Sequence, residues 1–502
     1  MIYQTEKQAW ENLLWYRTAY YNSMSALYSG DHAQLRASGM PHTFWRRNRC
    51  NCRVHVPVAS DIAATSADLL FSKQPVLTVY RGNEDATETD SQQRLTEMAD
   101  SNLIYNKLLE AAETAAALGD VYLKLMWKEG ADCPIFDVVQ PDTAWPEYMQ
   151  GELRCVHFFT VINISRETNA YLRVYERYEP GLITCALYKG TENDLGTRLP
   201  DSELEKYGLA PEIKAPIGEL LAVHIANIRP NRSFRLSMMG RSDMDNLRDL
   251  CDALDESYSS WVRDIRLGKA RTIVPVEYMR RAPNEILDGV AQSASWEFDP
   301  DIETFVAMDI DTDKAGAGIT MQQFEIRAEE HSRTCSDLLL QILNNAGYSP
   351  QTFGIGIEGS AESGTALTIR EKKSYTTRDK KRSYWKAPLE DILTRMMHLD
   401  AALGGGSHPD DRVDVEFGDS TNIDSQAIAQ TVEILDRARS ASLDTRLAML
   451  HPDWTQDQRT DEAETIRQEY SLDMPELLPN VQMGDMETER LPGVQLGGRG
   501  TE

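Results

Sequence analysis

The sequence has few cysteines and no long apolar run. Its 502 residues include seven cysteines, an odd number scattered along the chain, which argues against a disulfide framework and favours a reducing compartment. No stretch reaches the roughly 18 consecutive apolar residues of a membrane span. The N-terminus also lacks a basic segment followed by an apolar core. We therefore expect a soluble protein that neither enters a membrane nor carries a secretory signal.

Basic residues are also scarce, with 52 against 79 acidic residues and a net charge of −27. This balance excludes a protein that grips nucleic acid over most of its surface, because phosphate binding depends on Lys and Arg. An acidic surface that simply aids solubility explains the imbalance equally well. The length exceeds what one hydrophobic core serves, so about two to four substructures are expected.

The common motifs of catalysis are absent. There is no Gly-x-x-x-x-Gly-Lys-Ser/Thr loop for a nucleotide phosphate, and no His-Glu-x-x-His, Gly-x-Ser-x-Gly or Cys-x-x-Cys motif. Cys50, Cys52 and His55 lack the second ligand pair of a zinc site, so we predict no metal and no cofactor. His331 lies on a helical stripe and is expected to be packed or paired. These absences favour a structural or binding protein over an enzyme.

Two amphipathic helices separated by a short insert form the centre of the chain. The first is predicted from Ser242 to Gly268, with acidic residues at its start and basic residues at its end, as the helix dipole favours. The second is predicted from near Ile319 to Gly347. Between them, Arg271–Gly318 alternates extended pieces with turn signals, which predicts a small mixed α/β unit. Both helices have polar backs, so each needs a partner for its apolar stripe.

The part before these helices has an α+β pattern. Ile2–Tyr28 is predicted to be helical, and its many aromatic side chains favour docking on another surface. The basic, aromatic arm Phe44–Arg53 either contacts phosphate or lies on an acidic neighbour, and the acidic composition favours the neighbour. One helix is predicted over Gln92–Leu118. The predicted strands alternate and are joined by short turns, which favours an antiparallel sheet. They cover residues 75–80, 121–127, 136–139, 153–164, 170–178, 182–188 and 221–225.

A glycine-rich loop and a long helix follow the second amphipathic helix. The loop covers residues 351–364, where repeated glycines permit close backbone approach. The helix covers residues 365–399 and is predicted to kink at Pro388. Its first half is basic and its second half carries a core-type apolar stripe. The remaining predictions are a lone strand at 413–417, two or three small helices within 425–470, and a disordered tail from 471.

Five short motifs occur one after another along the chain. They are Ala115-Ala116-Ala117-Leu118-Gly119-Asp120-Val121-Tyr122, Val139-Gln140-Pro141-Asp142, Asp252-Ala253-Leu254-Asp255-Glu256, Arg263-Asp264-Ile265-Arg266-Leu267-Gly268, and Ser363-Gly364-Thr365-Ala366, the last followed by a basic helix with Trp385. In this order, over residues 1–470, the chain resembles the portal (head-to-tail connector) proteins of tailed bacteriophages.

The resemblance implies a portal-like α+β fold and a ring, usually of twelve subunits, at one capsid vertex, through which double-stranded DNA is packaged and ejected. The implied parts are an N-terminal helix and arm (1–60), an α+β wing (61–240), two stem helices (241–268 and 319–347), a small α/β clip (269–318), a tunnel loop with a kinked helix (348–400), a helical crown (401–470) and a tail (471–502). The implied partners are the terminase large subunit, the major capsid and scaffolding proteins and the tail adaptor or head-completion protein. The protein would be a late gene product, present in the virion and, during assembly, in the host cytoplasm.

The resemblance also assigns roles to three groups of residues. The tunnel loop facing DNA would comprise Gly354, Gly356, Gly359, Ser360, Ala361, Ser363 and Gly364. The basic helix, facing DNA or a neighbouring subunit, would contribute Arg370, Lys372, Lys373, Arg378, Lys380, Lys381, Arg382 and Lys386. The clip surface that docks the motor and the adaptor would include Arg271, Tyr278, Arg280, Arg281 and Trp296.

Two other classes stay open at the level of sequence. A virion adaptor that is not a portal would also form rings, but it would not promote capsid nucleation. A metal-dependent enzyme acting on nucleic acid would need carboxylates clustered around divalent metal, and paired carboxylates are too common in an acidic chain to indicate one.

Overall fold

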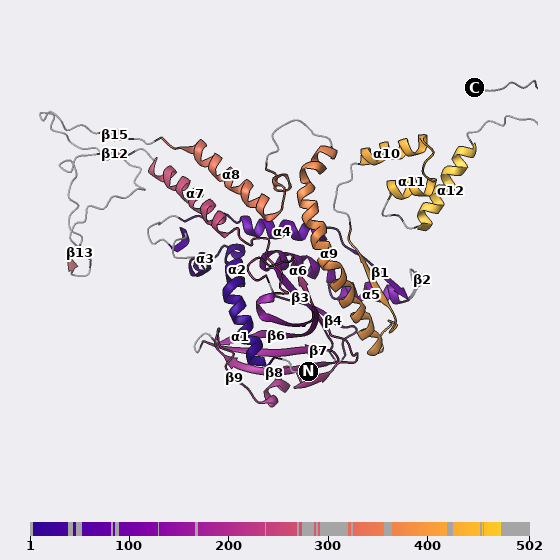
Figure 1. The fold of residues 1–502 in the computed structure, drawn as a ribbon, viewed down its shortest axis with the longest axis horizontal. Coiled ribbons are helices and arrows are strands. Elements are labelled where there is room, and N and C mark those ends of the chain that lie inside the picture. The colour runs from indigo at the N-terminus through magenta and orange to yellow at the C-terminus, as the bar shows by residue number, and fades with distance from the viewer. Residues whose placement is uncertain are drawn as a thin grey trace, which may run out of the picture. The chain divides into compact units, whose positions relative to one another are not determined.

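A computed structural model gives the fold of the chain (Figure 1). It describes residues 4–38, 44–46, 53–81, 84–85, 90–128, 130–165, 169–235, 237–268, 271–273, 286–287, 290–291, 320–322, 325–355, 364–418, 425–451, 454 and 456–472. The chain forms two compact units, Met1–Thr421 and Asn422–Glu502, and each is described by itself.

The N-terminal region is helical, as predicted. It comprises α1 (Glu6–Tyr16), a π-helical turn (Arg17–Tyr21), α2 (Asn22–Ser29) and α3 (His32–Ser38). Thr5 caps α1, because its hydroxyl accepts from the Gln8 amide at 3.3 Å while the Gln8 side chain accepts from the Thr5 amide at 3.0 Å. Gly30 ends α2 with a left-handed φ of 64°, close to the predicted end of this helical region at Tyr28.

The described residues of the first unit form three antiparallel sheets of three or more strands, besides two two-stranded pairs in the insert. The largest has the order β10-β8-β7-β6-β5, with β9 pairing to β8; the second has the order β11-β3-β4, and the third β16-β1-β2. The strands of the first sheet are β5 (Ala144–Met149), β6 (Glu152–Ser165), β7 (Ala170–Glu179), β8 (Leu182–Gly190), β9 (Thr197–Arg198) and β10 (Glu212–Lys214). Those of the others are β3 (Asp120–Met126), β4 (Ile135–Val139), β11 (Ala222–Ala226), β1 (Val76–Arg81), β2 (Glu84–Asp85) and β16 (Arg412–Glu416). The antiparallel prediction is confirmed, and the prediction of a lone strand at 413–417 is wrong because β16 pairs with β1.

Three helices pack in the core with these sheets. They are α4 (Val58–Phe71), α5 (Asp90–Ser101) and α6 (Ile104–Leu118). The prediction of one helix over Gln92–Leu118 is wrong, because Leu103 has a left-handed φ of 52° that separates α5 from α6. The alanine-rich face of α6 packs against α4 and is fully buried. Small side chains permit this close approach.

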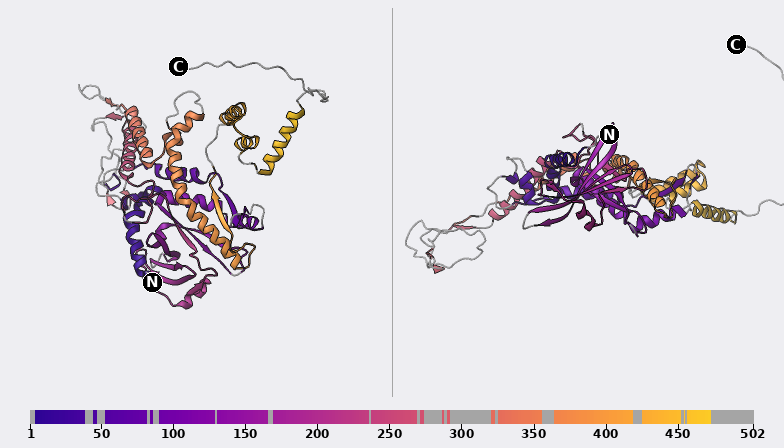
Figure 2. Two further views of the ribbon diagram at one scale, coloured as in Figure 1. Left: turned by 45° about the vertical axis from the view of Figure 1, so that its right-hand side comes forward. Right: turned by 90° about the horizontal axis from the view of Figure 1, so that it is seen from below.

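The two central helices are α7 (Arg248–Leu267) and α8 (Ala328–Ala346). They run side by side away from the sheets (Figures 1 and 2). Both predicted starts are wrong. Asn246 adopts a left-handed φ of 62°, so α7 begins at Arg248 rather than Ser242. Residues near the predicted second start instead form β15 (Thr320–Gln322).

Strand β15 pairs with β12 (Arg271–Ile273), so the insert between the helices begins and ends in a two-stranded ladder. The only other described part of the insert is the pair β13 (Ile286–Leu287) and β14 (Val290–Ala291). The other extended pieces predicted for the insert lie outside the described residues.

A single long helix, α9 (Gly364–Ala402), contains Pro388, and its ribbon changes direction part-way along (Figures 1 and 2). The predicted apolar stripe in its second half is confirmed. The side chains of Leu389, Ile392, Leu393, Met396 and Met397 are all fully buried in the core with the sheets.

The second unit contains α10 (Ser425–Arg437), α11 (Leu443–Leu450) and α12 (Gln456–Leu472), which confirms the prediction of two or three small helices. None of the described helices in either unit combines the length and the apolar character needed to cross a lipid bilayer.

Candidate functional site

The pair α7 and α8 is joined by polar contacts at its insert end. The Asp264 carboxylate of α7 accepts from Arg327 at 2.7 Å and lies 3.0 Å from His331 Nε2 of α8. His331 and Arg327 together hold the pKa of Asp264 below its ordinary value. The His331 ring also stacks on Trp261, which confirms the prediction that His331 is packed or paired.

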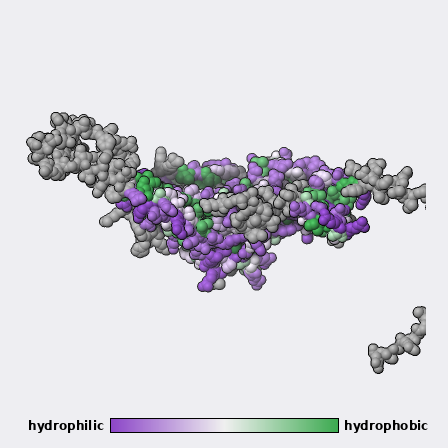
Figure 3. All heavy atoms as spheres, turned by 90° about the horizontal axis from the view of Figure 1, so that it is seen from above, coloured by the Kyte–Doolittle hydropathy of each residue, from purple (hydrophilic) through white to green (hydrophobic). Residues whose placement is uncertain are grey.

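The same end of the helix pair exposes apolar side chains. They belong to Ile265, Leu267 and Ile326. Figure 3 shows hydrophobic surface (green) beside the grey atoms at this end. Exposed apolar groups on paired helices are typical of a surface that another protein covers.

A buried carboxylate, Asp243, joins three elements at the other end of the pair. It lies before α7 and accepts from Lys381 of α9 at 2.6 Å, from Tyr348 just after α8 at 2.7 Å, and from Asn227 at 2.8 Å. The Lys381 and Asp243 side chains are each 1% exposed. Burial lowers the pKa of Lys381, while Asp243 opposes this shift. The start of α7, the end of α8 and the middle of α9 are therefore fixed to one another.

A second buried carboxylate, Asp120 at the start of strand β3, holds the segment around Gly240 that precedes α7. It accepts from the amide of Gly240 at 2.6 Å and from the Tyr21 hydroxyl at 3.0 Å, and it lies 2.7 Å from His224 Nε2. Gly119 and Gly240 permit this contact, because a Cβ on Gly240 would lie 2.1 Å from the Gly119 carbonyl oxygen. This contact explains why Gly119-Asp120 occurs in one of the motifs noted above.

The arm before α4 lies on the acidic face of α7. Asp255 accepts from the Trp45 indole at 3.0 Å and from the Val56 amide at 2.9 Å, and its carboxylate lies 2.9 Å from His55 Nδ1. Within the arm, Trp45 therefore contacts an acidic residue of the same chain, while Arg46 and Arg53 donate to the carbonyls of Arg36 and Trp45. Cys50 and Cys52 lie outside the described residues.

Asp252 lies one turn before Asp255 in a different environment. It is 6% exposed, and neither of its carboxylate oxygens has a hydrogen-bond partner among the described residues. Burial raises the pKa of Asp252 to about 6, an effect that Arg248 partly opposes. An unpaired buried carboxylate is costly when charged, which makes this residue a source of pH dependence.

The basic side chains in the first half of α9 point in different directions and have different partners. Lys381 lies in the interior, Arg378 is buried beside Tyr375, Lys373 donates to the Asn344 carbonyl, Arg382 donates to the Gly418 carbonyl, and Lys386 pairs with Glu390 and Asp414. Lys372 and Lys380 are exposed, and their ammonium groups make no ion pair with any described residue. The side chain of Arg370 is outside the described part of the chain. Among the described basic residues of this helix, Lys372 and Lys380 are therefore the exposed cations whose ammonium groups have no described partner within the chain.

The other predicted site residues are only partly described. Gly354 ends a short 3-10 turn with a left-handed φ of 74°, and Gly364 begins α9. The loop residues Gly356, Gly359, Ser360, Ala361 and Ser363 lie outside the described residues. Arg271 lies in β12, and the remaining clip residues Tyr278, Arg280, Arg281 and Trp296 are also outside them.

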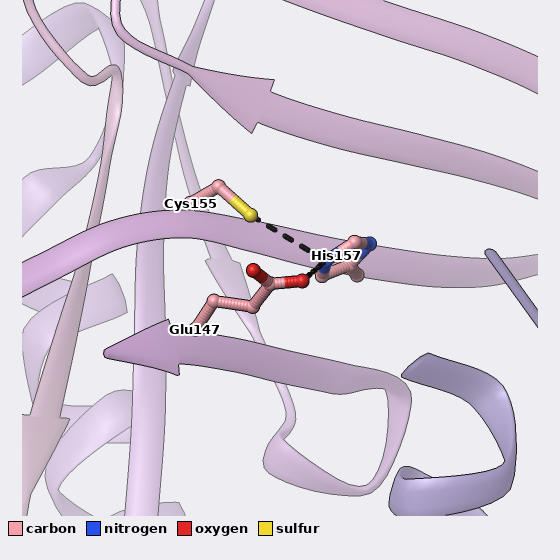
Figure 4. Close-up of side chains that lie close together, drawn as sticks. All are labelled: Glu147, Cys155 and His157. Atoms are coloured by element: carbon pink, nitrogen blue, oxygen red, sulfur yellow. Dashed lines mark hydrogen bonds and ion pairs between the residues drawn. The ribbon is translucent and has the colours of Figure 1, made fainter. Parts of the chain in front are cut away.

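Sequence reasoning missed one further cluster, formed by Glu147, Cys155 and His157 on the largest sheet (Figure 4). The signal present in the sequence was Cys-x-His within a predicted strand, which places both side chains on one face. The missing information was the neighbouring strand β5, which supplies Glu147.

Comparison with known proteins gives one family. The family model described as "Phage portal protein, SPP1 Gp6-like" matches residues 11–474. No curated protein sequence matches the chain. Similar solved chains occur in the structure titled "Virion of native gene transfer agent (GTA) particle", with 10% identity, coverage of 86% of this chain and 93% of that chain, and a TM-score of 0.37. Another occurs in "Neck of native GTA particle computed with C12 symmetry", with 12% identity, coverage of 84% and 93%, and a TM-score of 0.38.

Proposed function

Since this chain belongs to the SPP1 Gp6-like family of phage portal proteins, we propose that about twelve copies form a closed ring at one capsid vertex. Double-stranded DNA enters and leaves the capsid through the axis of this ring. The family match over residues 11–474 carries the proposal. The protein acts as a passage and a docking platform, and a separate terminase hydrolyses the nucleotide that drives packaging.

The helix pair α7 and α8 offers a surface for contacts between neighbouring copies of the ring. Its two helices contact each other and expose Ile265, Leu267 and Ile326 near the insert. Head-to-tail contacts between neighbouring copies bury such side chains, and closure of the ring leaves no copy with an open face. In this arrangement α7 and α8 are the stem, and the insert is the clip, which docks the terminase and later the tail adaptor.

The charge of the chain supports a passage rather than a tight grip on DNA. The net charge is −27, and most basic side chains of α9 are engaged within the subunit. Tight phosphate contacts oppose sliding, because each one adds to the affinity. The glycine-rich loop before α9 lines the passage, and Lys372 and Lys380 contact a neighbouring subunit or DNA, with the neighbour favoured.

In vitro packaging tests this function. Capsids assembled with scaffolding protein and this chain should package DNA, added with terminase and ATP, into a DNase-resistant form. Capsids assembled without the chain should package none. Equal DNase-resistant DNA in both preparations contradicts the proposed function.

A further inference from the structure

Three side chains of metal-binding type meet on one face of the largest sheet. Cys155 and His157 are two residues apart on β6, so both point to the same face. Glu147 on β5 is paired directly with Cys155. The three ligand atoms lie within 4.8 Å of one another, with Cys155 Sγ 3.4 Å and Glu147 Oε1 2.8 Å from His157 Nε2 (Figure 4).

The surroundings fix the orientation of two of these ligands. The Tyr175 hydroxyl lies 2.8 Å from His157 Nδ1, so Nε2 is the nitrogen that faces Cys155 and Glu147. The amide of Gln4, just before α1, donates to Glu147 Oε1 at 2.8 Å. A hydrogen bond to the far nitrogen of a histidine is the usual support of a metal-binding imidazole.

Burial and charge also suit a divalent cation. Cys155 and His157 are fully buried, while the Glu147 side chain remains 13% exposed and leaves a route for solvent. A divalent cation bound by one thiolate and one carboxylate is neutral overall. The nearby Arg177, opposite His157 on β7, already has Glu179 as its ion-pair partner.

We propose that Glu147, Cys155 and His157 bind one zinc ion in each subunit. Sulfur, imidazole nitrogen and carboxylate oxygen are the donors that zinc takes in proteins, and calcium and magnesium prefer oxygen alone. A water molecule or the second oxygen of Glu147 completes four-coordination on the exposed side. The ion ties β5 to β6 and, through Gln4, to the segment before α1.

Binding requires the Cys155 thiolate. Burial raises the pKa of the Cys155 thiol far above its ordinary value, so without metal the sulfur carries its proton. Zinc displaces this proton to solvent and forms the zinc–sulfur bond, with no change in oxidation state. Apparent affinity therefore rises with pH.

Cobalt(II) is the probe for the experiment, because a thiolate–cobalt bond gives a charge-transfer absorption in the near ultraviolet. The full-length chain carries Cys50→Ser and Cys52→Ser, so that neither of those thiols contributes. One equivalent of Co²⁺ should produce the band, and Zn²⁺ should remove it. X-ray absorption of the zinc-loaded chain should show one sulfur at about 2.3 Å and nitrogen or oxygen neighbours at about 2.0–2.1 Å.

Variants assign the site. Cys155→Ser should abolish the band, and Tyr175→Phe should keep it while lowering affinity roughly 10–100-fold, the usual cost of losing such a support. Cys185→Ser is the matched control, since Cys185 is another buried thiol of this sheet, on β8. Its change should leave band and affinity intact. Two results would overturn the proposal. One is a zinc shell without sulfur, which X-ray absorption detects without the Cys155→Ser variant, and the other is an unchanged band in Cys155→Ser. Either result would leave Glu147 and His157 as a hydrogen-bonded pair without metal.

Discussion

Asp243 and Asp252 are buried carboxylates on either side of the start of α7, and their surroundings are opposite. Asp243 accepts three hydrogen bonds, one of them from the buried Lys381 ammonium. Asp252 accepts none from any residue that the structure describes. The first is therefore expected to stabilise the junction of three helices, while the second destabilises the fold whenever it is charged.

Replacing Lys381 tests the junction. Lys381→Met should lower the free energy of unfolding by about 3–5 kcal/mol, because it leaves a buried carboxylate without its counter-charge. Denaturant unfolding at fixed protein concentration measures this. Lys380→Met on the exposed face of the same helix is the control and should change stability little. Equal effects of the two changes would show that the buried pair does not stabilise the junction.

Replacing Asp252 tests the unpaired charge through pH. Its folded pKa of about 6 lies above its ordinary value of 3.8, so the folded state binds more protons between these values. Stability is therefore gained as pH falls through 6 and lost as pH rises. From pH 5 to pH 8 the parent should lose about 1.4 kcal/mol relative to Asp252→Asn. Glu110→Gln, an exposed change on α6 whose charge does not act on Asp252, should follow the parent at both pH values.

Sequence reasoning located the basic residues of α9 but not their directions. Lys381 and Lys380 are adjacent in a run of cations, yet one is buried against Asp243 and the other is exposed. The partner that decides this, Asp243, is far away in sequence. A charge run defines a helix face only after the elements around the helix are known.

At the level of elements, the insert and the exposed cations of α9 have roles that can be tested apart from the fold. Ile273 and Thr320 are the last pair of the β12–β15 ladder on the side of the insert residues 274–319. Replacing residues 274–319 by Asn-Gly should close this ladder as a two-residue hairpin. The variant should keep the thermal stability of the parent and lose binding of the terminase large subunit in a pull-down assay. Retained terminase binding would contradict the assignment of the insert as the clip.

The exposed cations of α9 give a second test at this scale. The double change of Lys372 and Lys380 to Gln removes positive charge while leaving the internal contacts of Lys373 and Lys381 intact. If these residues face a neighbouring subunit, rings should weaken, as mass photometry over a dilution series would show. If they face DNA, rings should persist and DNA retention should fall. If both the rings and DNA packaging are unchanged, Lys372 and Lys380 contact neither a subunit nor DNA and are exposed to solvent only.

The types of element were predictable, and several ends were not. Apolar periodicity predicted α7, α8 and the buried half of α9, because it reports the face that a helix buries. Left-handed residues at Leu103 and Asn246 divided or shortened helices without a glycine or proline signal. Strand β16 was expected to be alone, since its pairing with β1 joins segments from opposite ends of the first unit.

At the scale of the whole molecule, the order of elements along the chain predicted the family, and the match over residues 11–474 confirms it. No single site carried that prediction, because a portal works through its assembly rather than through a catalytic centre. The same match favours a portal over an adaptor that is not a portal. The number of copies in the ring follows from contacts between subunits, which the sequence of one chain does not reveal.

The mass and shape of the purified chain show whether it forms a closed ring. Sedimentation velocity combined with negative-stain microscopy measures both at micromolar concentration. We expect one dominant species of about twelve chain masses, seen as rings with a central hole. A stable monomer or dimer, with no rings in the micrographs, would contradict it.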